Sequence, residues 1–283
     1  MNNKFIINFQ PGSTMLHKLT GTTKVRMFII FTVYLIMSWD LRLILPVTVA
    51  GIIGIISMKP NWKPIKFMLA FVIILNLFNL FLFFIADPDI GTKFCNSRTV
   101  LADLPGYLYL SGETLWYLFT RFIKILSSFL ISIIFILSIT PSEFAAGLNS
   151  VKVPYKICTV VELAYRCIPD IVRDYQNIST SMQARGVEMD PKKVSAFKRL
   201  KQMVMIIVPL LLSSFDKVGN IANAMDLRGY GKKKKRSYYA EHEMTKADKV
   251  FRVVYIVIAL ICVAYIAYKM LAPGYLQLWY PFA

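Results

Sequence analysis

The most informative stretch of the chain is FMLAFVIILNLFNLFLFFIA, residues 67–86. It has no charged side chain, and its length matches the roughly 20 apolar residues with which a helix crosses the hydrocarbon core of a bilayer. Its two amides, Asn76 and Asn79, lie three residues apart and share one face of a helix. Amides in a membrane helix commonly bond to a neighbouring helix, and a ligand contact is the alternative. The stretch therefore predicts a membrane-spanning helix packed against others.

Apolar runs on both sides predict four further spans, at Met27–Trp39, Leu43–Met58, Leu115–Ile139 and Val250–Leu271. Asp40 and Arg42 separate the first two runs. We expect two helices joined by a tight turn there, because one continuous helix would bury both charges in mid-membrane. Arg121 and Lys124 lie near the outer end of their span, from which long cationic side chains can extend to the headgroups. The sequence thus predicts an all-α, polytopic membrane protein with about five transmembrane helices.

The composition supports a membrane protein and indicates its orientation. Hydrophobic residues make up 56% of the 283 residues, above the 45–50% typical of soluble domains. The net charge of +17 fits either nucleic acid or an anionic membrane surface, and the long apolar runs exclude nucleic acid as the partner. Lys and Arg gather before the first span and between the second and third, whereas Asp87–Glu113 carries more acidic residues. The positive-inside rule then places the N-terminus and residues 141–249 in the cytoplasm.

Three regions follow: residues 1–140 with four spans, residues 141–249 as a cytoplasmic domain, and residues 250–283 with the last span and a short tail. The cytoplasmic region predicts long amphipathic helices. The first runs from Val160 to Arg185, with a possible kink or division at Pro169, because apolar residues recur there at spacings of three and four. The second begins after Asp190-Pro191, and its apolar run Met203–Leu212 looks too short to cross a bilayer, so we expect it at the inner membrane face.

Both predicted helices end in Arg followed by Gly, in Ala184-Arg185-Gly186 and in Leu227-Arg228-Gly229. An ordinary helix cap accounts for either end, since free carbonyls attract a cation and glycine lets the chain turn away. The second interpretation is a docking function. An arginine held at a helix tip can enter a groove of another protein and form bidentate bonds with a carboxylate.

Residues typical of catalytic, cofactor or metal sites are not grouped in the sequence. The four cysteines, Cys95, Cys158, Cys167 and Cys262, lack metal-site spacing, and His17 and His242 are far apart. A phosphate-binding glycine loop is also missing, so we expect no ATPase activity in this chain alone. Two alternatives to a non-catalytic transport subunit remain, a membrane enzyme that processes lipid or prenyl groups and a conventional ABC permease.

The chain resembles the transmembrane T component of energy-coupling factor (ECF) transporters. The resemblance rests on Ala184–Gly186 and Ala224–Tyr230, with Ser138–Phe144 and Tyr165–Pro169 also similar to the family. It implies a coupling subunit in a prokaryotic plasma membrane that transmits the motion of two cytosolic ABC-type ATPases to a small substrate-binding (S) subunit, for uptake of a vitamin or transition metal. It also implies that Arg185 and Arg228 contact acidic residues of the ATPases. Leu227 departs from the family pattern, which prefers alanine there.

The basic run Lys232–Arg236 follows the second Arg-Gly pair directly. Its position beside the expected inner membrane face suits anionic lipid headgroups. Membrane lipid is therefore a further predicted partner of the cytoplasmic region.

Overall fold

The computed structural model describes residues 14–95, 100–103, 109–187, 196–232, 244–271 and 278–281. The chain divides into two compact units, each described by itself below. Unit 1 comprises Met1–Val151 and Ala240–Ala283, and unit 2 comprises Lys152–Tyr239.

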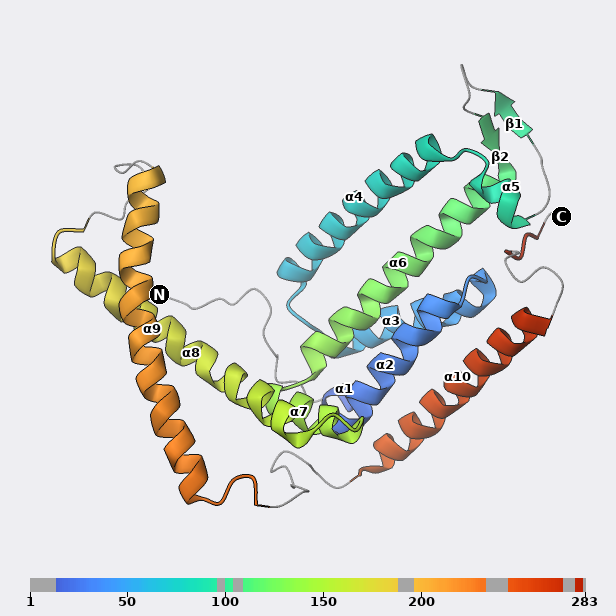
Figure 1. Ribbon diagram of the computed structural model, residues 1–283. Coiled ribbons are helices and arrows are strands. Elements are labelled where there is room, and N and C mark those ends of the chain that lie inside the picture. Colours follow the sequence, from blue (N-terminus) through green and yellow to red (C-terminus); the bar gives the residue numbers. More distant parts are fainter. Residues whose placement is uncertain are drawn as a thin grey trace. The chain divides into compact units, whose positions relative to one another are not determined.

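Unit 1 is a bundle of helices arranged around α6 (Figure 1). Helices α2, α3, α4 and α5 contact α6, while α10 packs along α2 and α7 packs against α2. The elements of the unit are α1 (Met15–Lys18), α2 (Gly21–Met37), α3 (Leu41–Met58), α4 (Trp62–Ala86), α5 (Ile90–Cys95), β1 (Val100–Asp103), β2 (Tyr109–Ser111), α6 (Gly112–Ser138), α7 (Pro141–Ser150) and α10 (Lys246–Leu271).

Apolar side chains from α3, α4 and α6 form the main core of unit 1. This cluster contains Ile55, Met58, Ile65, Leu130, Ile133, Ile134 and Leu137. A second cluster joins α2, α3 and α10 through Tyr34, Leu35, Ile44, Val47 and Cys262. Polar links cross the same interfaces: the hydroxyls of Thr48 and Ser127 are 2.5 Å apart, and Asn76 Nδ2 donates to the carbonyl of Phe122 at 3.3 Å. The predicted bond between the Asn76 amide and a neighbouring helix is therefore confirmed.

Five helical segments of the described residues are long and apolar enough to cross a bilayer. They are Leu41–Met58, Trp62–Ala86, Gly112–Ser138, Leu200–Leu227 and Lys246–Leu271. Their number confirms the expectation of about five spans in a helical membrane protein. The predicted break at Asp40 is also confirmed, because α2 ends at Met37 and α3 begins at Leu41.

The identity of the candidate spans differs from the sequence prediction in two places. Helix α2, which holds most of Met27–Trp39, has 17 residues and is not among the five, although it packs against α6 and α10. In contrast, the segment Leu200–Leu227 does qualify. The expected length of its apolar segment rested on Met203–Leu212 alone. The helix continues to Leu227, as predicted, and with the apolar residues beyond Leu212 it is long and apolar enough to count as a candidate span.

Unit 2 consists of two long helices that cross, α8 (Tyr155–Ala184) and α9 (Ala196–Leu227) (Figure 1). Helix α8 runs through Pro169 without dividing, so the possible break there is not found. Asp174 of α8 forms an ion pair with Lys217 of α9, and the rings of Tyr155 and Tyr230 meet edge to face at 6.1 Å. The predicted start signal at Asp190-Pro191 lies outside the described residues.

The predicted external loop Asp87–Glu113 contains helix α5 and the antiparallel strands β1 and β2. In the part of the chain that the structure describes, these two are the only β-strands. The C-terminal tail reaches the same end of the bundle, where Leu278 N donates to Phe94 O at 2.8 Å and Trp116 Nε1 donates to Trp279 O at 2.9 Å. These bonds attach the C-terminal tail to α5 and α6, at the end of unit 1 that the sequence predicts to lie outside.

Candidate functional site

The first Arg-Gly motif forms a complete C-terminal cap on α8. The helix ends at Ala184, Arg185 occupies the cap position, and Gly186 is left-handed with φ of +88°. Gly186 N donates to Gln183 O at 2.9 Å, and Val187 N donates to Met182 O at 3.1 Å. This pair of bonds defines a Schellman motif, in which the left-handed residue lets the chain satisfy the last free carbonyls of the helix.

The second motif ends α9 in the same way. Arg228 occupies the cap position after Leu227, and Gly229 has φ of +72°. Gly229 N donates to Asp226 O at 2.9 Å, and Tyr230 N donates to Met225 O at 3.0 Å. The two motifs therefore share one backbone geometry, and the predicted left-handed stop after each arginine is confirmed.

Both arginines lie at exposed helix tips. The side chains of Arg185 and Arg228 are exposed, and the neighbouring Leu227 is 90% exposed. Among the residues that the structure describes, neither guanidinium has an ion-pair or side-chain hydrogen-bond partner. The two helix ends lie at separate places on the crossed pair rather than side by side (Figure 1). Each tip can thus present a planar, permanently charged group to a separate partner surface.

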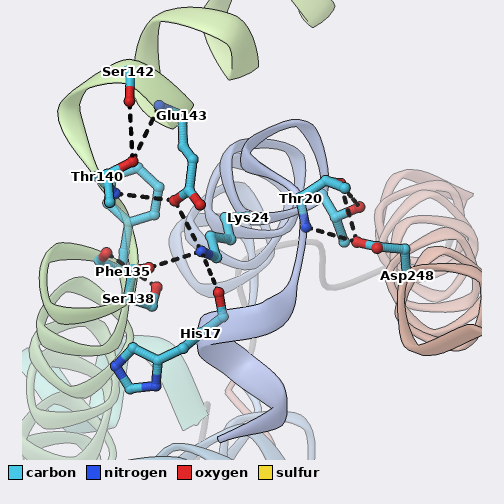
Figure 2. A network of polar contacts seen from close by, with 10 residues as sticks. His17, Thr20, Lys24, Phe135, Ser138, Thr140, Ser142, Glu143 and Asp248 are labelled. Atoms are coloured by element: carbon cyan, nitrogen blue, oxygen red, sulfur yellow. Dashed lines mark hydrogen bonds and ion pairs between the residues drawn. The ribbon is translucent and has the colours of Figure 1, made fainter. Parts of the chain in front are cut away.

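A polar network that was not predicted from the sequence lies where α2, α7 and α10 begin in unit 1 (Figure 2). The Lys24 ammonium group lies among three acceptors: Ser138 O at 2.8 Å, Glu143 Oε2 at 3.0 Å and His17 O at 3.0 Å. Beside it, Asp248 at the start of α10 accepts hydrogen bonds from the backbone N–H of Thr20 at 2.9 Å and from its hydroxyl at 3.0 Å. The network thus joins the starts of α2, α7 and α10.

One signal for this network was present in the sequence. Thr140-Pro141-Ser142-Glu143 has the spacing of a capping box, and the structure contains both of its bonds. The partner of Glu143 was not predictable in this way, because Lys24 lies 119 residues earlier in the chain.

Arg121 and Lys124 contact aromatic rings and polar groups within unit 1. The Arg121 guanidinium carbon lies 3.6 Å from the centroid of the Phe83 ring, and its Nη2 is 3.4 Å from Asn79 Oδ1. Lys124 Nζ lies 4.0 Å from the centroid of the Trp39 ring and donates to Ile36 O at 2.9 Å. Both cations therefore have partners inside the bundle, besides the headgroups that the sequence suggested.

The described residues contain no group of three or more His, Cys, Asp or Glu side chains that could hold a metal ion. The four cysteines carry no disulfide. Burial raises the pKa of the Cys95 thiol to about 11, which keeps it protonated and a poor nucleophile near neutral pH. The candidate functional site that the described residues support is thus the pair of exposed arginines at the ends of α8 and α9.

The chain combines a multi-pass helical membrane bundle with two long amphipathic helices, α8 and α9, that each end in an exposed arginine. These features define a class of protein: a membrane subunit that acts through contacts with other proteins. Comparison with known proteins agrees with this class. Residues 12–239 match the CbiQ family, described as cobalt transport protein.

Curated relatives match over nearly the whole chain. The chain is 25% identical over 278 residues to the energy-coupling factor transporter transmembrane protein EcfT of Lactococcus lactis, an alignment that covers 93% of this chain and 98% of the relative. It is 27% identical to EcfT of Leuconostoc gelidum, over 88% of this chain and 92% of that protein. EcfT of Bacillus selenitireducens is 25% identical, over 89% and 92%.

The chain belongs to the CbiQ family, and it is a transmembrane component of the EcfT type, the non-catalytic membrane subunit of an energy-coupling factor transporter. The resemblance drawn from the Arg-Gly motifs is therefore confirmed.

Proposed function

We propose that unit 2 couples ATP hydrolysis to transport, with Arg185 and Arg228 each docked on one of two cytosolic ABC-type ATPase subunits. The observation that carries this proposal is the shared geometry of the two helix ends. Each holds an exposed arginine at the cap position of a Schellman motif. An arginine on a rigid helix tip loses little conformational freedom when it pairs with a carboxylate, which favours tight docking.

The cytoplasmic location of unit 2 is supported by charge. The turn before α4 and its first residues carry Lys59, Lys63 and Lys66, in the pattern typical of a cytoplasmic loop. Helix α9 is apolar enough to cross a bilayer, but its Lys217 pairs with Asp174 of α8. A crossing α9 would bring this charged partner helix to the hydrocarbon region at a high cost in free energy. We therefore place α9 at the inner membrane face.

The apolar faces of the same helices suit a second partner. Helix α9 exposes Val204, Ile207, Val208, Leu211, Leu212 and Phe215. A surface of this kind needs cover from another protein or from lipid. We propose that it contacts a small membrane S subunit that binds the transported vitamin or transition metal, so that tilting of the rods moves the S subunit. Anionic lipid beside the basic run Lys232–Arg236 would hold the rods at the membrane.

The test is affinity purification of the full-length protein from its native membranes, with mass spectrometry of the proteins that come with it. We expect two ABC-type ATPase polypeptides, or two copies of one, together with a small hydrophobic protein. Arg185→Glu and Arg228→Glu should each reduce ATPase recovery by about tenfold or more, because a reversed charge at a docking carboxylate costs several kcal/mol.

The matched control is Arg173→Glu. Arg173 is also exposed on α8, and in the described residues its ion pair is with Asp170 of the same helix, at 3.8 Å. The control should retain the ATPases. Unchanged ATPase recovery in both tip variants would contradict the docking assignment and leave the two motifs as helix caps.

A further inference from the structure

Helix α7 is attached to α2 at three points, and the first is a buried ion pair at its N-terminus. Lys24 of α2 is 2% exposed, and its ammonium group lies 3.0 Å from Glu143 Oε2. The same group donates to Ser138 O and His17 O, so its three N–H donors are all satisfied. Moving α7 away from α2 would leave a buried charge without its partner, which is strongly unfavourable.

Glu143 also determines where α7 begins. Its Oε2 accepts a hydrogen bond from Thr140 N at 3.0 Å, and its own N–H donates to Thr140 Oγ1 at 3.3 Å. One carboxylate therefore closes the capping box of α7 and binds Lys24. Because the two functions share one side chain, the first turn of α7 is fixed to α2.

The second point is a close contact between the two backbones. A Cβ added at Gly21 would lie 2.2 Å from Glu143 O, and one added at Gly147 would lie 2.4 Å from Val25 Cγ2 and 2.6 Å from Gly21 O. These distances leave no room for any side chain at either glycine. The middle of α7 therefore rests directly on the start of α2.

The third point is at the C-terminus of α7. Arg26 Nη2 of α2 donates to Ser150 O at 2.9 Å, which satisfies one of the last free carbonyls of the helix. The chain then leaves α7 through Val151, and Lys152, the first residue of unit 2, has a left-handed φ of +68°. Helix α7 is thus held along its whole length up to the point where unit 2 begins.

We propose that Lys24, Glu143 and Arg26 are positioning residues for transport, and this inference rests on the proposed function. They fix α7 to the membrane bundle, so a displacement of unit 2 driven by the ATPases is passed to the bundle rather than lost between α7 and α2. Coupling requires such stiff, packed connections, because a loose joint would dissipate the motion. The Thr20–Asp248 bonds extend the same connection to α10.

The experiment measures whether α7 moves relative to the bundle during the nucleotide cycle. Spin labels are attached to cysteines introduced at Asn149 of α7 and Lys63 of α4, with the four native cysteines replaced by alanine. The protein is studied in its complex with the co-purified ATPases in lipid nanodiscs. Pulsed electron spin resonance then gives the distance between the labels without nucleotide and with a trapped ATP analogue.

In the otherwise unchanged protein we expect the same distance distribution in both nucleotide states. In Lys24→Met we expect a shift of the distribution that depends on nucleotide, because the motion of unit 2 is then absorbed between α7 and α2. A purely structural role would broaden the distribution equally in both states. A nucleotide-dependent shift without the Lys24 substitution, or no such shift in the variant, would overturn the inference.

Two further variants keep the test decisive. Arg26→Gln releases only the C-terminal end of α7 and leaves the buried ion pair intact, so it serves if Lys24→Met does not fold. Lys93→Met removes the exposed ion pair between Lys93 of α5 and Asp87 at the end of α4, away from α7, and should behave like the unsubstituted protein. Absence of ATPases from the unsubstituted complex would instead refute the proposed function, and this inference with it.

Discussion

The two units of the molecule differ in how their helices are held to one another. Unit 1 encloses polar groups such as Lys24, Thr20 and Asp248 and gives each a partner from another helix. Unit 2 leaves most of its apolar residues uncovered, up to the tip residue Leu227. A surface of that kind is stable only with another protein or lipid against it. Unit 1 has uncovered apolar helices as well, α4 among them, but polar links hold its helices to one another, whereas the described ion pair between the helices of unit 2 is that of Lys217 with Asp174.

The largest expected effect concerns the side of the membrane on which unit 2 lies. Single cysteines at Lys156 and Lys232 should both react with a membrane-impermeant maleimide only after cells are permeabilised. A cysteine at Lys93 of α5, in the segment that the charge pattern predicts to be external, should react in intact cells. Labelling is all or none in such an assay. If Lys156 and Lys232 responded oppositely, α9 would cross the bilayer and unit 2 would belong with the spans of unit 1.

Glycine-to-alanine substitutions should change the stability of the two units in opposite directions. Gly21→Ala and Gly147→Ala place a methyl group against backbone and side-chain atoms closer than 3 Å, so each should destabilise by about 1–3 kcal/mol or more. Gly219→Ala in α9 meets nothing within 4 Å and should stabilise by about 1 kcal/mol through helix propensity. The measurement is the temperature at which a buried thiol reacts with a dye, Cys262 for the variants of unit 1 and Cys158 for the variant of unit 2, with the other cysteines replaced. Equal tolerance at all three glycines would contradict the close contact of α2 with α7.

Gly186→Ala and Gly229→Ala should have smaller effects. Each forces a residue with a Cβ into the left-handed region, at a cost of about 1–2 kcal/mol that loosens the last turn and misplaces the adjacent arginine. We expect about fivefold weaker ATPase retention, since 1 kcal/mol corresponds to about that factor. Asparagine tolerates this conformation, so Gly229→Asn is the control and should retain the ATPases. An equal loss in the alanine and asparagine variants would mean that any side chain at this position weakens docking, whatever its backbone angle.

The smallest effect should come from Lys217→Ala. Among the described residues, its ion pair with Asp174 links α8 to α9, but the side chain of Lys217 is about half exposed. Partly exposed pairs contribute about 0.2–1 kcal/mol, so thermal stability should fall only slightly. Lys93→Ala, an exposed pair in unit 1, gives the reference value. A loss as large as that of Gly21→Ala would mean that this pair holds the two helices together.

Local signals in the sequence predicted much of the candidate site. The Arg-Gly pairs indicated both helix ends, and Thr140 with Glu143 has the spacing of a capping box. Such features involve residues three to five apart, whose geometry a helix fixes by itself. The continuation of α9 past Leu212 to the second Arg-Gly pair was also predicted. The length of its apolar segment was underestimated, because Ser213, Ser214 and the charged residues beyond look like the end of an apolar run.

The sequence by itself determined that this is a helical membrane protein, where its long helices end, and that two of them end in an arginine followed by glycine. Periodicity, capping and the length needed to cross a bilayer are local or additive properties, so they are legible in a linear chain. Only the tertiary structure decided that Lys24 would pair with Glu143 and that Gly21 would touch α7. Such contacts depend on how separate helices pack, and the same side chains could have met water, lipid or other partners in a different arrangement.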